Sequence, residues 1–171
     1  MIPQKAILLP KPQHQSHLCF GCSSTNKFGL DLDFYYYKDK VYSYFSPTKF
    51  HVGWGKITHG RISATLCDES IGWISIFLFE EIIVTKELNV KYFTPISVNE
   101  ELTIISSLLE NHPRYPKIQC TIYNKDEKKC VEAIAIISKL NNKLAKRFNI
   151  MDNHELELFS NFIKKIKSTY K

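Results

Sequence analysis

The chain contains 171 residues, of which 44% are hydrophobic, 13% aromatic and 23% charged. This composition is typical of one globular domain and excludes a disordered chain, because enough apolar surface is present to form a core. The longest apolar run, residues 71–79, falls well short of the roughly 18 residues that a membrane-spanning helix needs. The first ten residues lack the apolar segment and cleavage site of a secretory signal. We therefore expect neither a membrane span nor secretion.

Positive charge is concentrated in the last part of the chain. The formal net charge is +6, and residues 139–171 hold eight of the 23 Lys and Arg but only three of the 17 Asp and Glu. Such a basic segment could contact nucleic acid or an anionic membrane. No aromatic stacking platform or recognition motif accompanies it, so we interpret it as a solvated helix face and expect no nucleic-acid partner. The five cysteines, an odd number, favour free thiols and a cytoplasmic location.

The first half of the chain changes from strand-like to helical periodicity. Residues 1–26 carry a cysteine pair and several prolines and are expected to form an extended arm. Apolar residues alternate over 30–34 and 41–45 around a turn at 38–40, which predicts a hairpin. After a glycine-containing loop at 47–58, apolar residues recur at helical spacing and predict a central helix that is apolar on most sides: Ile62, Leu66, Ile71, Ile74 and Leu78.

The second half predicts four strands and a second helix. An amphipathic helix over 152–171 begins with a capping box of Asp152 and Glu155. Before it, segments rich in Val, Ile, Thr and Tyr predict an antiparallel meander of four strands, at 85–92, 101–109, 117–123 and 130–138.

This order of elements predicts an α+β fold in which one strongly curved antiparallel sheet wraps around the central helix, with an extra C-terminal helix. We divide the chain into an arm at 1–26, a central domain at 27–140 and a basic helical extension at 141–171. A single sheet cannot cover its helix completely, so we expect the chain to pair with a copy of itself, as a homodimer or a dimer of dimers.

The start of the central helix has the features of a site that polarises a carbonyl group. The first backbone N–H groups of a helix have no intrahelical acceptor and lie at the positive end of its dipole. Gly60 at this point lets a substrate carbonyl approach the backbone closely, where a developing oxyanion would be stabilised. Asp68 follows eight residues later, about two helical turns. It can therefore share a face with Gly60 and act as a base or a nucleophile on the same carbonyl.

A set of short motifs, taken in order and at these spacings, resembles the hotdog-fold acyl-CoA thioesterases of the PaaI-like branch. The motifs are residues 19–22 (CFGC), Asn26, 28–30 (FGL), 51–54 (HVGW), 59–60 (HG), 66–73 (LCDESIGW) and 85–95 (TKELNVKYFTP). The resemblance covers residues 19–138 and implies a hotdog fold for them.

The resemblance also implies roles for particular positions. Asp68 stands at the catalytic carboxylate, Gly60 at the backbone oxyanion donor and His59 at the residue that shapes the turn. Thr85 matches a hydroxyl that orients the attacking water from the neighbouring subunit. The implied reaction is hydrolysis of an acyl-CoA thioester, with CoA as the leaving group and with no metal or further cofactor.

Two departures from the family pattern affect the expected activity. Arg61 replaces the second glycine of the usual His-Gly-Gly, and no amide side chain stands near Val52 or Gly53, where relatives often carry Asn or Gln. The missing amide is expected to lower activity or to abolish it. The Arg61 charge opposes the helix dipole, and two interpretations stay open: the side chain receives a substrate carboxylate or a CoA phosphate, or it extends into solvent.

Trp54 and Glu69 complete the candidate substrate-binding residues. Glu69 projects about 100° around the helix from Asp68, and we expect it to face a partner subunit or solvent. Cys67 is expected to be a small buried hydrophobe, since no basic partner is evident. Arg114, in a loop between two strands, could meet a CoA phosphate, although a surface loop is the default interpretation.

The arm also carries four residues with the chemistry of metal ligands, namely His14, His17, Cys19 and Cys22. Cys-x-x-Cys beside two histidines has a tolerable spacing for zinc. No second Cys-x-x-Cys completes a zinc ribbon, and His-x-x-His-x-Cys is tight for a tetrahedral site. We therefore expect a structural arm and no metal.

Other function classes stay open beside the thioesterase. A non-catalytic module that binds acyl-CoA or an acyl carrier would keep the fold without turnover, and Arg61 and the missing amide favour it. A hotdog hydratase or dehydratase is less favoured, because the Asp-then-His dyad of that chemistry is not evident. Contact of the basic tail with nucleic acid or a partner is a third, weaker hypothesis.

Overall fold

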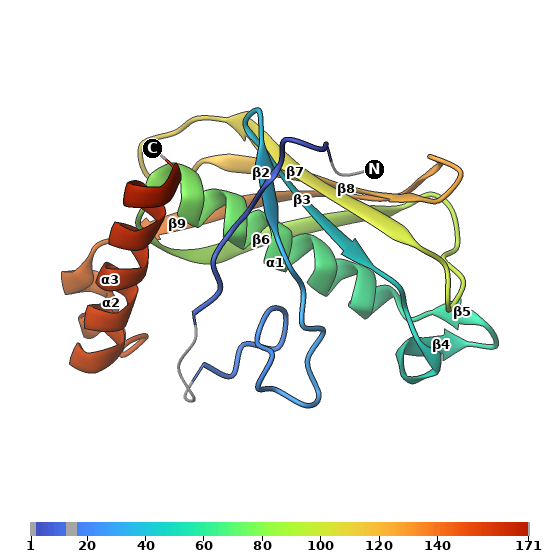
Figure 1. Ribbon diagram of the computed structural model, residues 1–171, viewed down its shortest axis with the longest axis horizontal. Coiled ribbons are helices and arrows are strands. Elements are labelled where there is room, and N and C mark those ends of the chain that lie inside the picture. The colour runs from blue at the N-terminus through green and yellow to red at the C-terminus, as the bar shows by residue number, and fades with distance from the viewer. Residues whose placement is uncertain (1–2, 13–16, 171) are drawn as a thin grey trace.

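A single antiparallel sheet wraps around one long helix, α1 (Gly60–Phe79), in the computed structural model, which describes residues 3–12 and 17–170 (Figure 1). This arrangement confirms the predicted α+β fold and the helix expected from the apolar spacing. The sheet has seven strands in the order β1-β2-β3-β7-β8-β9-β6. Their bounds are β1 (Ile7–Leu8), β2 (Tyr35–Tyr37), β3 (Lys40–Phe45), β6 (Ile82–Tyr92), β7 (Leu102–Glu110), β8 (Lys117–Asn124) and β9 (Lys129–Leu140).

The core lies between α1 and the concave face of the sheet. Leu66, Ile71 and Ile74 of α1 are fully buried, as are Ile104 and Ile122 of the strands that face them. By length and composition alone α1 would also suit a membrane span, but half of the apolar window is buried inside the domain. The helix is therefore apolar on most sides because it is the centre of the domain.

The predicted four-strand meander is wrong in one respect, the position of β6. β7, β8 and β9 follow one another in the sheet as expected, but β6 pairs with β9 and not with β7. β7 instead pairs with β3. The connection from β6 to β7 crosses the start of α1, where the Thr58 N–H donates to the Ile96 carbonyl at 2.8 Å. β6 thus forms one edge of the sheet, beside the N-terminal half of α1.

The predicted N-terminal hairpin is displaced along the chain. Residues 30–34 do not join the sheet, although Leu32 and Phe34 point into the core as their alternation indicates. The hairpin is formed by β2 and β3, and its turn residues Lys38 and Asp39 have positive φ angles of 45° and 59°. Backbone bonds from residues 30 and 32 to the preceding turn hold this segment in place of a strand ladder.

The arm and the C-terminal extension both pack on the side of α1 that the sheet leaves open (Figure 1). Trp73 of α1 stacks on Phe34 with ring centroids 5.0 Å apart and meets Phe162 edge-on at 5.9 Å. The arm also supplies the short strand β1, which the sequence does not reveal. His14 lies outside the described residues.

Two helices end the chain, α2 (Asn142–Arg147) and α3 (Asn153–Tyr170). The predicted capping box of α3 is present, since Asp152 and Glu155 exchange two bonds of 2.8 Å. The predicted apolar stripe is buried at Leu156, Ile163 and Ile166. α2 was not predicted, because it is only six residues long.

Candidate functional site

His59 and Gly60 form the start of α1. His59 is the N-cap residue, and its Nδ1 accepts the backbone N–H of Arg61 at 3.0 Å. The Ile62 N–H donates to the His59 carbonyl at 2.9 Å. Within the described part of the chain, the Gly60 N–H has no hydrogen-bond acceptor. One donor at the positive end of the helix dipole is therefore available to a ligand.

The loop before α1 is fixed by close backbone contacts. It contains a short hairpin, β4 (Val52–Trp54) and β5 (Ile57–Thr58), and the His59 N–H donates to the His51 carbonyl at 2.8 Å. A Cβ added to Gly53 would lie 2.7 Å from the Cα of His59. An amide side chain at position 53 would therefore not fit without a shift of the helix start.

Tyr92, which sequence reasoning missed, completes the helix start from the side of β6. Its hydroxyl donates to the Gly60 carbonyl at 2.9 Å. The alternation of Leu88, Val90 and Tyr92 along β6 is the signal that would have placed this ring toward α1.

A cavity of about 320 Å³ opens beside Gly60. Thr58 also lines it, and the Thr58 Oγ1 is buried without a hydrogen-bond partner among the described residues. The rest of its wall is mostly apolar and comes from the end of β6 and the connection that follows, together with Ile57, Ser63 and Val131. Larger hollows lie elsewhere, at the ends of β3 and β7 (about 720 Å³) and between the arm, α1 and α3 (about 670 Å³).

Asp68 is held by a hydroxyl from β6. The Thr85 Oγ1 donates to the Asp68 Oδ1 at 2.7 Å, and both side chains are half-buried. Thr85 adjoins a register shift in the pairing of β6 with β9. This contact joins two residues of one chain, and the expected role of Thr85 toward a neighbouring subunit stays a prediction.

Gly60 and Asp68 lie on the same face of α1, the face toward β6. The contact of Tyr92 with Gly60 and that of Thr85 with Asp68 both come from this strand. β6 is an edge strand, and its outer side pairs with no other described strand. The group therefore lies along an open edge of the sheet.

The remaining candidates do not join this group. Arg61 is exposed, and the described residues offer its guanidinium no ion-pair partner. Trp54, 86% exposed, lies in the small hairpin. Glu69 differs from its expected position, because it faces the arm: both of its carboxylate oxygens lie 3.4 Å from the Cys19 Sγ.

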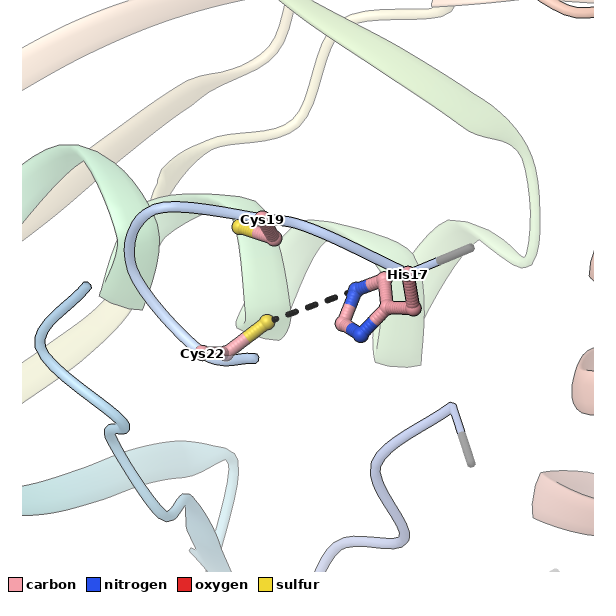
Figure 2. A group of neighbouring side chains, drawn as sticks. All are labelled: His17, Cys19 and Cys22. Carbon is pink, nitrogen blue, oxygen red and sulfur yellow. Dashed lines mark hydrogen bonds between the residues drawn. The ribbon is translucent and has the colours of Figure 1, made fainter. Parts of the chain in front are cut away.

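A second cluster forms where the arm meets α1. The ligand atoms of His17, Cys19 and Cys22 all lie within 4.8 Å of one another (Figure 2). The neighbouring Cys22 thiol lowers the pKa of Cys19, whereas the Cys19 thiol and burial raise the pKa of Cys22. The arm thus brings three side chains with metal-binding chemistry together.

The family model described as "Thioesterase superfamily" matches residues 55–131, which run from the loop before α1 into β9. Over these residues, which are less than half of the chain, the sequence is similar to the thioesterase superfamily. No curated protein shows a significant match to the chain.

Solved structures of the thioesterase superfamily share this fold. Protein RHA08564, a thioesterase superfamily protein, is 22% identical, with a TM-score of 0.63 over 67% of this chain and 57% of its own. Protein smu.793 from Streptococcus mutans, solved bound to acetyl CoA, is 18% identical, with a TM-score of 0.61 over 64% and 89%. The PaaI protein of the E. coli phenylacetic acid degradation operon is 12% identical, with a TM-score of 0.61 over 66% and 81%. At these identities the likeness establishes the fold.

Proposed function

We propose that this protein is an acyl-CoA thioesterase whose reaction takes place between α1 and β6. The observation that carries the proposal is the pairing of two groups on one face of α1: the Gly60 N–H, which has no acceptor among the described residues, and the Asp68 carboxylate, which Thr85 holds at 2.7 Å. An exposed main-chain donor and a fixed carboxylate are what acyl transfer to water requires.

The chemistry follows from these positions. The thioester carbonyl oxygen accepts the Gly60 N–H at the start of α1, where the His59 cap fixes the backbone. Asp68 removes a proton from a water molecule, and the water oxygen attacks the carbonyl carbon. The tetrahedral oxyanion is stabilised by the N–H and by the helix dipole, an effect of about 2.7–4 kcal/mol per donor in other enzymes. Its collapse breaks the carbon–sulfur bond, and the proton passes to the departing thiolate, which yields a carboxylic acid and free CoA.

A second copy of the chain would complete the site. β6 presents an unpaired edge beside Asp68, and pairing of two such edges would cover the opening and exclude water. We therefore include a homodimer in the proposal. The acetyl CoA bound to smu.793 supports an acyl-CoA ligand for this fold, and the exposed Arg61 suits an anionic part of that ligand.

The test is thiol release from short, long, aromatic and dicarboxylic acyl-CoA esters by the wild type and by Asp68→Asn. We expect kcat to fall on the order of 10²–10⁴-fold in this variant, because the water loses its base. Asp126→Asn, in the turn between β8 and β9, is the matched control and should keep full activity. Equal turnover in Asp68→Asn and wild type would refute the assignment.

A second candidate is a module that binds acyl-CoA without turnover. The close contact of Gly53 with His59 favours it, since position 53 has no room for the amide that relatives often carry near this point. Tight binding of acyl-CoA by calorimetry together with no thiol release would support the module.

A further inference from the structure

Figure 2 shows the His17 ring directed toward the Cys22 thiol, with Cys19 on the same turn of the arm. The Cys22 Sγ lies 3.9 Å from the His17 Nε2, and the three ligand atoms lie within 4.8 Å of one another. In a tetrahedral zinc site with thiolate and imidazole ligands, neighbouring ligand atoms are about 3.5–3.8 Å apart. A small contraction of this cluster would therefore bring it to the spacing of a zinc site.

The cluster is held in place by the fold. The Leu30 N–H donates to the Phe20 carbonyl at 2.8 Å, and the Leu32 N–H donates to the Gly21 carbonyl at 3.0 Å. These two bonds fasten the cysteine turn to a segment whose side chains enter the core. The hydroxyls of Ser23 and Thr25 both donate to the His17 carbonyl. Ordering these ligands thus requires no new folding of the arm, which removes much of the entropic cost of binding an ion.

Glu69 of α1 approaches this cluster at Cys19, although its carboxylate is not among the ligand atoms that all lie within 4.8 Å of one another. Both of its oxygens lie 3.4 Å from the Cys19 Sγ, and the Trp73 Nε1 donates to its Oε1 at 3.1 Å. Gly21 allows this approach, because a side chain at that position would clash with the Glu69 carboxylate. A carboxylate oriented by an indole N–H has the arrangement of a metal ligand with an outer hydrogen-bond donor.

A bound cation would also balance the negative charge that this cluster carries once its thiols are deprotonated. Glu69 forms no ion pair with a lysine or arginine among the described residues. A divalent ion would stabilise the carboxylate and two thiolates at once. Two thiolates, one imidazole and one carboxylate are a donor set that suits Zn²⁺.

We propose that His17, Cys19, Cys22 and Glu69 bind one zinc ion that joins the arm to α1. The two thiol protons pass to solvent when the ion binds. With four protein ligands the site is closed, so the ion is structural and holds α1 at the residue next to Asp68. This inference does not depend on the proposed thioesterase activity.

The test begins with the full-length chain incubated with zinc chloride or cobalt chloride and then freed of excess metal. We expect one zinc ion per chain by mass spectrometry. The cobalt form should show the visible d–d bands of a tetrahedral ion and a thiolate-to-cobalt charge-transfer band. Cys22→Ser should lose the ion or show a weaker charge-transfer band, because only the Cys19 thiolate remains. Cys130→Ser, at a buried free cysteine in β9, should behave as the wild type.

Glu69→Gln tests the fourth ligand. Its zinc affinity, measured by competition with a chromophoric chelator, should fall at least 10–100-fold. Unchanged affinity in this variant would overturn the four-ligand site.

A measurement on the wild type guards against variants that do not fold. Alkylation of Cys19 and Cys22, followed by peptide mass spectrometry, should be slow in the zinc form and fast after addition of a chelator. The proposal is wrong if zinc is not retained and the two thiols react equally with and without it. It is also wrong if the pair is recovered as a Cys19–Cys22 disulfide that excludes zinc.

Discussion

Two neighbouring carboxylates on α1, those of Asp68 and Glu69, have opposite surroundings. Asp68 faces the open edge strand β6 and receives one hydroxyl, from Thr85. Glu69 faces the arm and receives the Trp73 indole and the Cys19 thiol. Asp68 lies beside the open edge of the sheet, whereas the arm and α3 cover the neighbouring side of α1, which carries Glu69. One step of about 100° along a helix therefore separates a side chain suited to chemistry from one suited to holding the fold together.

Substitutions on the side of α1 that the arm and α3 cover should change the stability of the protein. Trp73 is 5% exposed and contacts both Phe34 and Phe162, so Trp73→Ala removes packing between α1, α3 and the segment before β2. We expect the free energy of unfolding to fall by about 3–5 kcal/mol, measured by urea denaturation. Trp54→Ala, which removes an exposed ring, should change it by less than about 0.5 kcal/mol. Similar losses in both variants would contradict the assignment of Trp73 to the core.

Substitutions on the side of α1 toward β6 should change the rate of the proposed reaction. Thr85→Val keeps the shape of the side chain but removes the donor to Asp68. A hydrogen bond to a charged group contributes about 1.5–3 kcal/mol, so we expect kcat to fall on the order of 10–100-fold with little change in KM. Thr85→Ser should restore most of the rate. A loss of stability without a loss of kcat would show that the hydroxyl has only a structural role.

A substitution of Arg61 tests which part of the substrate the side of α1 toward β6 binds. In Arg61→Gly we expect kcat/KM for dicarboxylic acyl-CoA to fall up to about fivefold relative to neutral acyl-CoA, the range of an exposed ion pair. If Arg61 binds a CoA phosphate, the loss should be equal for both esters and should disappear with dephospho-CoA esters. A variant that matches the wild type on every ester would leave Arg61 in solvent.

The smallest expected effect is a pH dependence of hydrogen exchange in the loop before α1. Burial lowers the pKa of His51, whose Nδ1 accepts the Thr48 N–H at 2.9 Å. The stabilising effect of the neutral ring is complete above the unfolded pKa of about 6.5 and is lost as the pH falls through the lower folded value. Hydrogen exchange of the Thr48 amide should therefore quicken, relative to other loop amides, between pH 7 and pH 5. His51→Asn retains an acceptor that does not titrate and should abolish this pH dependence.

Local patterns in the sequence were sufficient to predict much of the fold. The apolar spacing predicted α1, and the Asp152–Glu155 pair predicted the start of α3. The spacing of Gly60 and Asp68 predicted a shared face, because helical geometry fixes that relation without knowledge of the rest of the chain. Contacts from β6 to both residues agree with this prediction.

Contacts between residues that lie far apart in the sequence could not be predicted from local patterns. The four strand segments were found, but nothing within β6 indicates that it pairs with β9 rather than β7. The same limit applies to Tyr92, whose contact with Gly60 joins residues 32 positions apart. Glu69 was misplaced because its partner Cys19 lies 50 positions earlier, in an arm whose packing on α1 no local pattern records.

The unpaired edge of β6 has a consequence for how the protein works at different abundances. A single protomer exposes the outer side of an eleven-residue strand that pairs with no other described strand there, and such an edge can pair with further chains. Lys86, Glu87 and Lys91 place charges along this edge and disfavour such stacking. If two copies meet there to close the site, as we propose, the proposed thioesterase activity would rise more steeply than in proportion to the amount of protein, and dilution alone would abolish it.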